Sequence, residues 1–89
     1  MARTLLKGDE VNLPTSAGLG VSFSEATVVR LVNTNTAARV ITVQETRGGT
    51  GVGTFTMLPN TTEYLEKVAS HTVFANAAGV QGVKVGFTG

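Results

Sequence analysis

The chain has 89 residues, of which 42% are hydrophobic and 15% are charged, and its formal net charge is +1. This length is enough for one domain with a small core. The absence of cysteine excludes disulfides, zinc–thiolate sites and thiol nucleophiles together. The seven Lys and Arg residues are spread along the chain without a cluster, so we expect no nucleic-acid partner. A surface of mainly uncharged polar groups favours a chain that packs against copies of itself or against a partner.

The first 25 residues are predicted to form an extended N-terminal arm and a connection within a single β domain that spans residues 1–89. Residues 4–13 (TLLKGDEVNL) can supply one or two edge strands. Residues 14–25 are a Gly/Ser-rich connection, although residues 22–27 are alternatively one helical turn capped by Ser24. Because no apolar run is long enough for a secretory signal or a bilayer span, we expect no membrane partner.

A β-hairpin is the strongest structural prediction for the next part of the chain. Residues 26–33 alternate, with Val29 and Leu31 on one face, and residues 39–45 alternate with Ile41 and Val43 on one face. The intervening NTNTAA favours a turn because Asn side chains bond their own backbone.

Four glycines follow between residues 48 and 53, which raises the possibility of a phosphate-binding loop. Such a loop needs a lysine and the start of a helix. No lysine follows here, the spacing is not GxGxxG because Thr54 replaces the last glycine, and a strand pattern comes next. The segment is therefore predicted to be a flexible hairpin connection whose tip can still serve as an interaction surface.

Short strands fill the rest of the chain, over residues 52–58, 62–67, 71–76 and 83–88. The first should bury Phe55 and Met57 and end at Pro59. The last should turn Val83, Val85 and Phe87 inward and Lys84 outward, while Gly86 marks a bulge or a close neighbour. The sequence therefore predicts an all-β fold, a small antiparallel β-sandwich or barrel of six to eight short strands.

Few residues point to catalysis or to metal binding, and we predict no catalytic, cofactor or metal site. His71 is the only histidine and is expected at a strand start or on the surface. Asp9 and Glu10 are adjacent and alone provide too few oxygens for calcium. Asn60 begins a glycosylation sequon that a proline–asparagine turn explains better. Tyr64 fits cross-strand packing better than ligand stacking.

The order of these segments resembles small all-β virion structural proteins of tailed bacteriophages, particularly cyanophages. The segments are MARTLLKG, TVVRLVNTNTAARVITVQE, GTFTMLPNTTEYLEKVASHTVFAN and VKVGFTG, and the strand, proline turn and strand in FTMLPNTTEYLEK are the most telling. The resemblance implies a capsid cement or decoration subunit, or a small tail component, with no enzymatic activity. It also implies other virion proteins as partners, above all the major capsid protein, and a homo-oligomer, with a trimer favoured. The protein would then be made in the host cytoplasm and reside in the virion.

Two regions are predicted to make contacts: the N-terminal arm, which can add to a neighbour's sheet while a leucine fills a pocket, and the glycine loop. A glycan or host-surface recognition module that uses a loop tip and an aromatic side chain is the alternative function. The predicted contact residues are Arg3, Leu5, Leu6, Arg47, Gly48, Gly49, Gly51, Gly53 and Tyr64.

Overall fold

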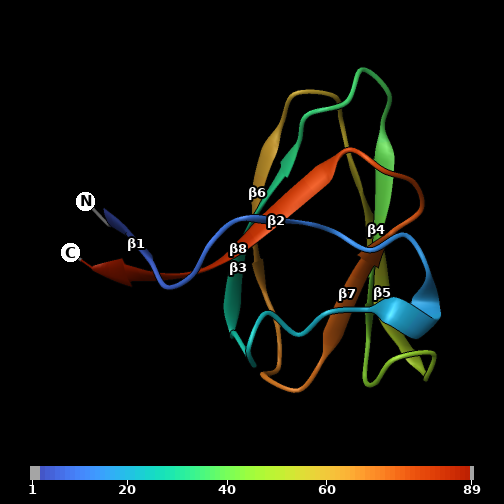
Figure 1. The fold of residues 1–89 in the computed structure, drawn as a ribbon, viewed down its shortest axis with the longest axis horizontal. Helices are drawn as coiled ribbons and strands as arrows, with labels where there is room; N and C mark the ends of the chain where they lie inside the picture. Colours follow the sequence, from blue (N-terminus) through green and yellow to red (C-terminus); the bar gives the residue numbers. More distant parts are fainter. Residues whose placement is uncertain (1–2, 89) are drawn as a thin grey trace.

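A computed structural model describes residues 3–88 of the chain. The protein folds into two antiparallel β-sheets packed face to face (Figure 1). The strands are β1 (Arg3–Leu6), β2 (Val11–Asn12), β3 (Val28–Asn33), β4 (Arg39–Gln44), β5 (Gly51–Met57), β6 (Thr62–Glu66), β7 (Thr72–Ala75) and β8 (Val80–Thr88). A short 3-10 turn over Ala17–Leu19 is the one helical element of the described residues. The all-β prediction is confirmed, and the first two residues of the predicted arm lie outside the described residues.

The larger sheet has the strand order β1-β8-β3-β6, with β2 also paired to β8, and the smaller sheet has the order β5-β4-β7. Strand β8 pairs with β3 along its first half and with β1 along its second half. Among the described residues β5 and β6 each pair on one side only, so the sheets form a sandwich and not a closed barrel. The two edge strands predicted in residues 4–13 are confirmed as β1 and β2.

The core lies between the two sheets and is built mainly from β-branched side chains. Val29 and Leu31 of β3 and Ile41 of β4 are fully buried, and Val43 is 7% exposed, as the alternation predicted. Met57 is fully buried and Phe55 is half-buried against the core. β-branched residues suit this position because they pack well on a pleated surface.

The predicted hairpin between residues 26–33 and 39–45 is wrong, because these two strands belong to different sheets. Strand β3 pairs with β6 and β8, whereas β4 pairs with β5 and β7. The NTNTAA segment does form the expected local bonds, since the Asn33 and Asn35 side chains accept from the backbone N–H groups of Asn35 and Ala37. Two strands that face each other across a core show the same alternation as two strands of a hairpin. The hairpin connection predicted at the glycine loop is confirmed, because β4 and β5 on either side of it pair antiparallel.

The inward orientation predicted for the last strand is also wrong, because β8 turns the opposite face to the core. Val83 lies beside Arg30 on the outer face, where Val83 and Val85 are 3% and 4% exposed, and Phe87 is 49% exposed. On the inner face Gly82 and Lys84 lie beside Leu31 and Val29. The outer face is therefore apolar at its centre.

The alternative prediction of a helical turn capped by Ser24 is wrong. Phe23, Ser24 and Glu25 have φ values of 57°, 54° and 58°, so the chain makes a left-handed turn. The Ala26 N–H donates to the Ser22 carbonyl oxygen at 3.2 Å across this turn. L-residues adopt this conformation at a cost, and here it places the Phe23 ring in the core.

Gly82 is held in a space with no room for a side chain. A Cβ atom at this position would lie 2.7 Å from the Phe23 Cζ atom and 2.9 Å from the Leu31 Cδ2 atom. Gly86, by contrast, has the flexible Lys7 side chain as its close neighbour.

Replacing Gly82 by Ala is expected to lower the free energy of unfolding by about 1–2 kcal/mol, because the core must shift to accept the methyl group. Urea unfolding followed by circular dichroism measures this change. Gly51→Ala is the control, since a Cβ atom there meets nothing within 4 Å. Equal stability of the two variants would contradict the prediction.

Candidate functional site

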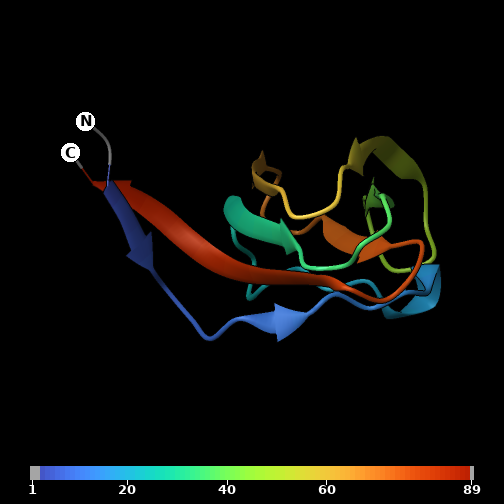
Figure 2. The same cartoon turned by 90° about the horizontal axis from the view of Figure 1, so that it is seen from above.

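A two-stranded ribbon formed by β1 and the last residues of β8 projects from the sandwich (Figures 1 and 2). All residues of β1 are exposed, and Leu5 and Leu6 are 48% and 65% exposed. Phe87 adds a large apolar side chain from β8. We call this ribbon, residues 3–7 and 85–88, the terminal arm. Isolated two-stranded ribbons are marginally stable in water, so such an arm gains stability when it packs against something else.

Tyr64 of β6 connects the far edge of the sheet to the terminal arm. Its ring centroid lies 5.3 Å from that of Phe87, with an interplanar angle of 60°. Its hydroxyl lies 3.4 Å from the Thr4 hydroxyl, where either group can donate. The hydrogen bond with Thr4, together with a smaller effect of Arg30, lowers the pKa of the Tyr64 phenol below its usual value. The predicted cross-strand packing of Tyr64 therefore takes the form of a contact with the arm.

Replacing Thr4 by Val should return the pKa of Tyr64 toward its usual value, because the valine cannot hydrogen-bond the phenolate. Tyr64 is the only tyrosine and the chain has no tryptophan, so ultraviolet absorbance against pH measures this group alone. Thr56→Val, on the exposed part of β5, is the matched control. An unchanged midpoint in Thr4→Val would show that the arm does not hold this contact in solution.

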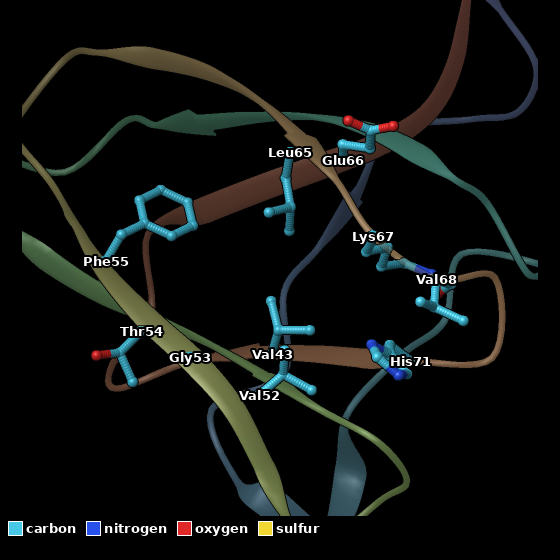
Figure 3. Close-up of a pocket in the computed structure, with 10 residues that line it drawn as sticks. All are labelled: Val43, Val52, Gly53, Thr54, Phe55, Leu65, Glu66, Lys67, Val68 and His71. Atoms are coloured by element: carbon cyan, nitrogen blue, oxygen red, sulfur yellow. The ribbon is translucent and has the colours of Figure 1, made fainter.

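A pocket of about 390 Å³ opens between β5 and β6, where the two sheets leave the sandwich open (Figure 3). Its walls are mostly apolar and come from both sheets. Phe55 and Val52 line it from β5, and Leu65 lines it from β6. The remaining lining residues are Val43, Gly53, Thr54, Glu66, Lys67, Val68 and His71.

Lys67 is buried at one end of this pocket, being only 8% exposed. Its Nζ atom donates to the carbonyl oxygens of Ala26, Ala69 and Val68 at 2.7, 3.1 and 3.4 Å. Burial lowers the pKa of the Lys67 ammonium, an effect that Glu25 opposes and Lys84 reinforces. An ammonium group has three donors. Because all three are used, Lys67 has no free donor for a ligand, and the mostly apolar pocket is suited to an apolar group.

The glycine loop is bound to the 3-10 turn region at the opposite end of the molecule from the terminal arm (Figure 1). The Arg47 Nε atom donates to the Gly20 carbonyl oxygen at 2.7 Å, and the Gly48 N–H donates to the Ala17 carbonyl oxygen at 2.9 Å. Gly48 has a φ of 67°, which a residue with a side chain rarely adopts. Gly49 lies in the same turn, and Gly51 and Gly53 are exposed on β5.

Asp9 and Glu10 are not brought together as ligands. Glu10 accepts from Arg30 at 3.4 Å on the outer face, whereas Asp9 lines a second pocket of about 230 Å³ with Lys7 and Lys84. His71 lies at the first pocket, on the other side of the fold. Within residues 3–88 no group of three or more His, Asp or Glu side chains is placed to hold a metal ion. No helix of the described part is long and apolar enough to cross a membrane.

Sequence reasoning identified the exposed arm residues and Tyr64, but it missed the pocket, Phe87 and the burial of Lys67. The pocket is formed by two strands that do not pair, so no local pattern marks it. Comparisons with protein families, with curated proteins and with solved structures found no match to this chain.

Proposed function

We propose that this protein is a non-enzymatic structural subunit of a tailed-phage virion, most concretely a capsid cement or decoration protein. The observation that carries the proposal is the terminal arm, which projects from the sandwich and exposes Leu5, Leu6 and Phe87. Isolated exposed apolar residues are common, but several on one projecting ribbon mark a protein contact. The segment order that resembles phage virion proteins supports the same role.

A subunit of this kind acts by adding buried area between shell proteins. Many weak contacts sum to a large effect when the subunit is present in many copies, because each bound copy raises the effective concentration of the next contact. The arm supplies backbone groups on a free edge and apolar side chains, which is the chemistry of strand addition. Its partner would be the major capsid protein, and the subunit would function as a homo-oligomer within the virion.

The test measures binding of the purified protein to capsid shells assembled without their decoration protein. Sedimentation should recover the protein with the shells, and the shells should melt at a higher temperature than bare shells. Leu5→Ser/Leu6→Ser is expected to reduce both effects, while Leu58→Ser, an exposed apolar residue of the connection between β5 and β6, serves as the control. Shells that neither bind the protein nor gain stability would overturn the cement role.

A second candidate is recognition of a glycan on a host surface or at the tail. The half-exposed Tyr64 and Phe87 rings lie side by side next to Arg30, an arrangement that offers an aromatic surface with a hydrogen-bond donor. Binding to a glycan array that is lost in Tyr64→Ala, combined with indifference to shells, would favour this role over the cement role.

A further inference from the structure

The larger sheet ends in two unpaired edges, β1 on one side and β6 on the other. Among the described residues each of these strands pairs with one neighbour only, β1 with β8 and β6 with β3. All four residues of β1 are exposed, and so are four of the five residues of β6. Free edges of this kind accept a further strand unless the protein blocks them.

The two edges carry opposite charges. Arg3 and Lys7 lie on the β1 edge, whereas Glu63 and Glu66 lie on the β6 edge. The one ion pair of residues 3–88 joins Arg30 and Glu10 elsewhere on the sheet, so these four charges remain available to a partner. Opposite charges on the two edges of one sheet favour contact between the first edge of one copy and the second edge of another.

The strand directions allow this contact. Each neighbouring pair along β1-β8-β3-β6 is antiparallel, so β1 and β6 run in opposite directions. A second copy that continues the sheet in the same orientation therefore places its β1 antiparallel to β6 of the first copy. Antiparallel pairing is the more stable arrangement per residue.

The free backbone groups of the two strands also match. The Lys7 N–H donates to Lys84, so alternate residues of β1 point toward β8, and the backbone groups of Thr4 and Leu6 point to the free edge. The Lys67 N–H donates to Thr27, so on β6 the residues with free backbone groups are Thr62, Tyr64 and Glu66.

We propose that β1 of one copy pairs with β6 of the next copy, so that the chain assembles head to tail through a continuous sheet; this rests on the proposed role as a multi-copy structural subunit. In the register that we infer, the facing pairs are Arg3–Lys67, Thr4–Glu66, Leu5–Leu65, Leu6–Tyr64 and Lys7–Glu63. Leu6 and Tyr64 then exchange backbone hydrogen bonds, since both have their free groups at the edge. Two apolar pairs and one ion pair form at once. The one like-charged pair, Arg3–Lys67, costs little because the Lys67 ammonium is turned toward carbonyl groups of its own chain.

The two neighbouring registers that keep the sheet faces aligned place Leu5 opposite a charged residue. A shift of two residues in one direction places Leu5 against Glu63, and a shift in the other direction places it against Lys67. A shift by one residue would turn the side chains to the wrong faces. The inferred register also sets Leu5 beside Leu65, which lines the pocket between β5 and β6, so the partner's leucine covers apolar surface that is otherwise open.

A contact between two different edges is heterologous, so repeated copies close into a ring or extend as a filament. The test is the mass of the purified protein by light scattering over a concentration series. The wild type should form a concentration-dependent oligomer. Lys7→Glu and Glu63→Lys should each weaken self-association about tenfold, because each variant places two like charges opposite each other across the contact.

Charge exchange provides the decisive comparison. The double variant Lys7→Glu/Glu63→Lys should recover self-association, and an equimolar mixture of the two single variants should associate more strongly than either alone. The matched control is the pair Arg39→Glu and Glu45→Lys, charges on the smaller sheet and its loop, away from both edges. Single variants that associate like the wild type, or a double variant no better than the singles, would overturn the proposal.

A backbone variant tests the strand pairing independently of charge. Leu6→Pro removes an N–H from the free edge and leaves the bonds between β1 and β8 in place, because a proline is tolerated where its N–H would face outward. We expect Leu6→Pro to be a monomer by light scattering and folded by circular dichroism. Leu6→Ala should lose less of the self-association, because it keeps the backbone N–H. Persistent self-association of a folded Leu6→Pro protein would contradict the pairing.

These outcomes are separable from failure of the cement role. A wild-type oligomer that obeys the charge exchange but ignores capsid shells would keep the head-to-tail contact and remove the proposed function. A wild-type monomer that binds shells would do the reverse.

Discussion

Asn33→Leu is expected to lower the free energy of unfolding by about 3 kcal/mol, because the buried Met57 carbonyl and the partly buried Ala37 carbonyl lose a donor, and the Asn35 N–H loses its acceptor. Asn33 is fully buried at the end of β3. The two N–H groups on its Nδ2 atom are shared among the carbonyl oxygens of Ala37, Met57 and Leu58, at 3.0, 3.1 and 3.3 Å from Nδ2. One amide thus ties β3 to the connection that enters β4 and to the end of β5. Leucine fills a similar volume but supplies no donor.

Urea unfolding followed by circular dichroism measures this loss. Asn33→Asp should be at least as destabilising, because the carboxylate keeps an acceptor for the Asn35 N–H but buries a charge and donates to none of the carbonyls. Asn12→Ala is the control, since Asn12 is exposed and its side chain accepts an exposed hydrogen bond from Gln81. A loss below about 1 kcal/mol for Asn33→Leu would show that water replaces the amide at this site.

The same residue shows why the strands could be predicted and their partners could not. Alternation in residues 28–33 and 39–44 identified the buried side chains of β3 and β4, because burial on one face leaves a period of two. Alternation carries no information on which strand lies alongside. Asn33 looked like a turn residue in the sequence, and it is one, but the turn carries the chain across the core from one sheet to the other.

The last strand was misread for a related reason. Val83, Val85 and Phe87 form an apolar face, and an apolar face is expected to meet the core. In the structure the core side of β8 holds Gly82, whose missing side chain admits Phe23 and Leu31. The valines are covered instead on the outer face. A glycine that makes room for a large neighbour leaves no periodic signal.

The two contact regions predicted from the sequence lie at opposite ends of the fold. Arg3, Leu5 and Leu6 lie on the terminal arm, which Tyr64 contacts through Thr4. The glycine-loop residues lie at the other end of the fold, where two of them bind the 3-10 turn region. The arm could be recognised from its exposed leucine pair, whereas its proximity to Tyr64 depends on how β8 extends past β3.

Lys67→Met is expected to lower the free energy of unfolding by about 2–3 kcal/mol, because the buried Ala26 carbonyl loses a charge-assisted hydrogen bond and two partly buried carbonyls lose theirs. The loss is smaller than three full bonds, since removal of the ammonium also removes the cost of burying its charge. Lys84→Met is the matched control, because its Nζ atom makes one exposed contact, with the Ser24 carbonyl oxygen at 3.2 Å. Urea unfolding near neutral pH measures both variants, and equal losses would contradict the special role of Lys67.

The pH dependence of stability gives a second, independent measure of Lys67. Burial lowers the pKa of Lys67 in the folded protein below the usual 10.5, so the unfolded chain binds this proton more tightly. The stability that this group contributes is therefore present above the unfolded pKa and is lost as the pH falls through the folded pKa. Tyr64 acts with the same sign, because its folded pKa is also lowered.

Urea midpoints of the wild type should thus rise more steeply between neutral pH and the unfolded pKa of lysine than those of Lys67→Met. Tyr64→Phe should retain the part of this slope that comes from Lys67. Parallel profiles for the wild type and Lys67→Met would mean that the ammonium is as well solvated in the folded protein as in the unfolded chain.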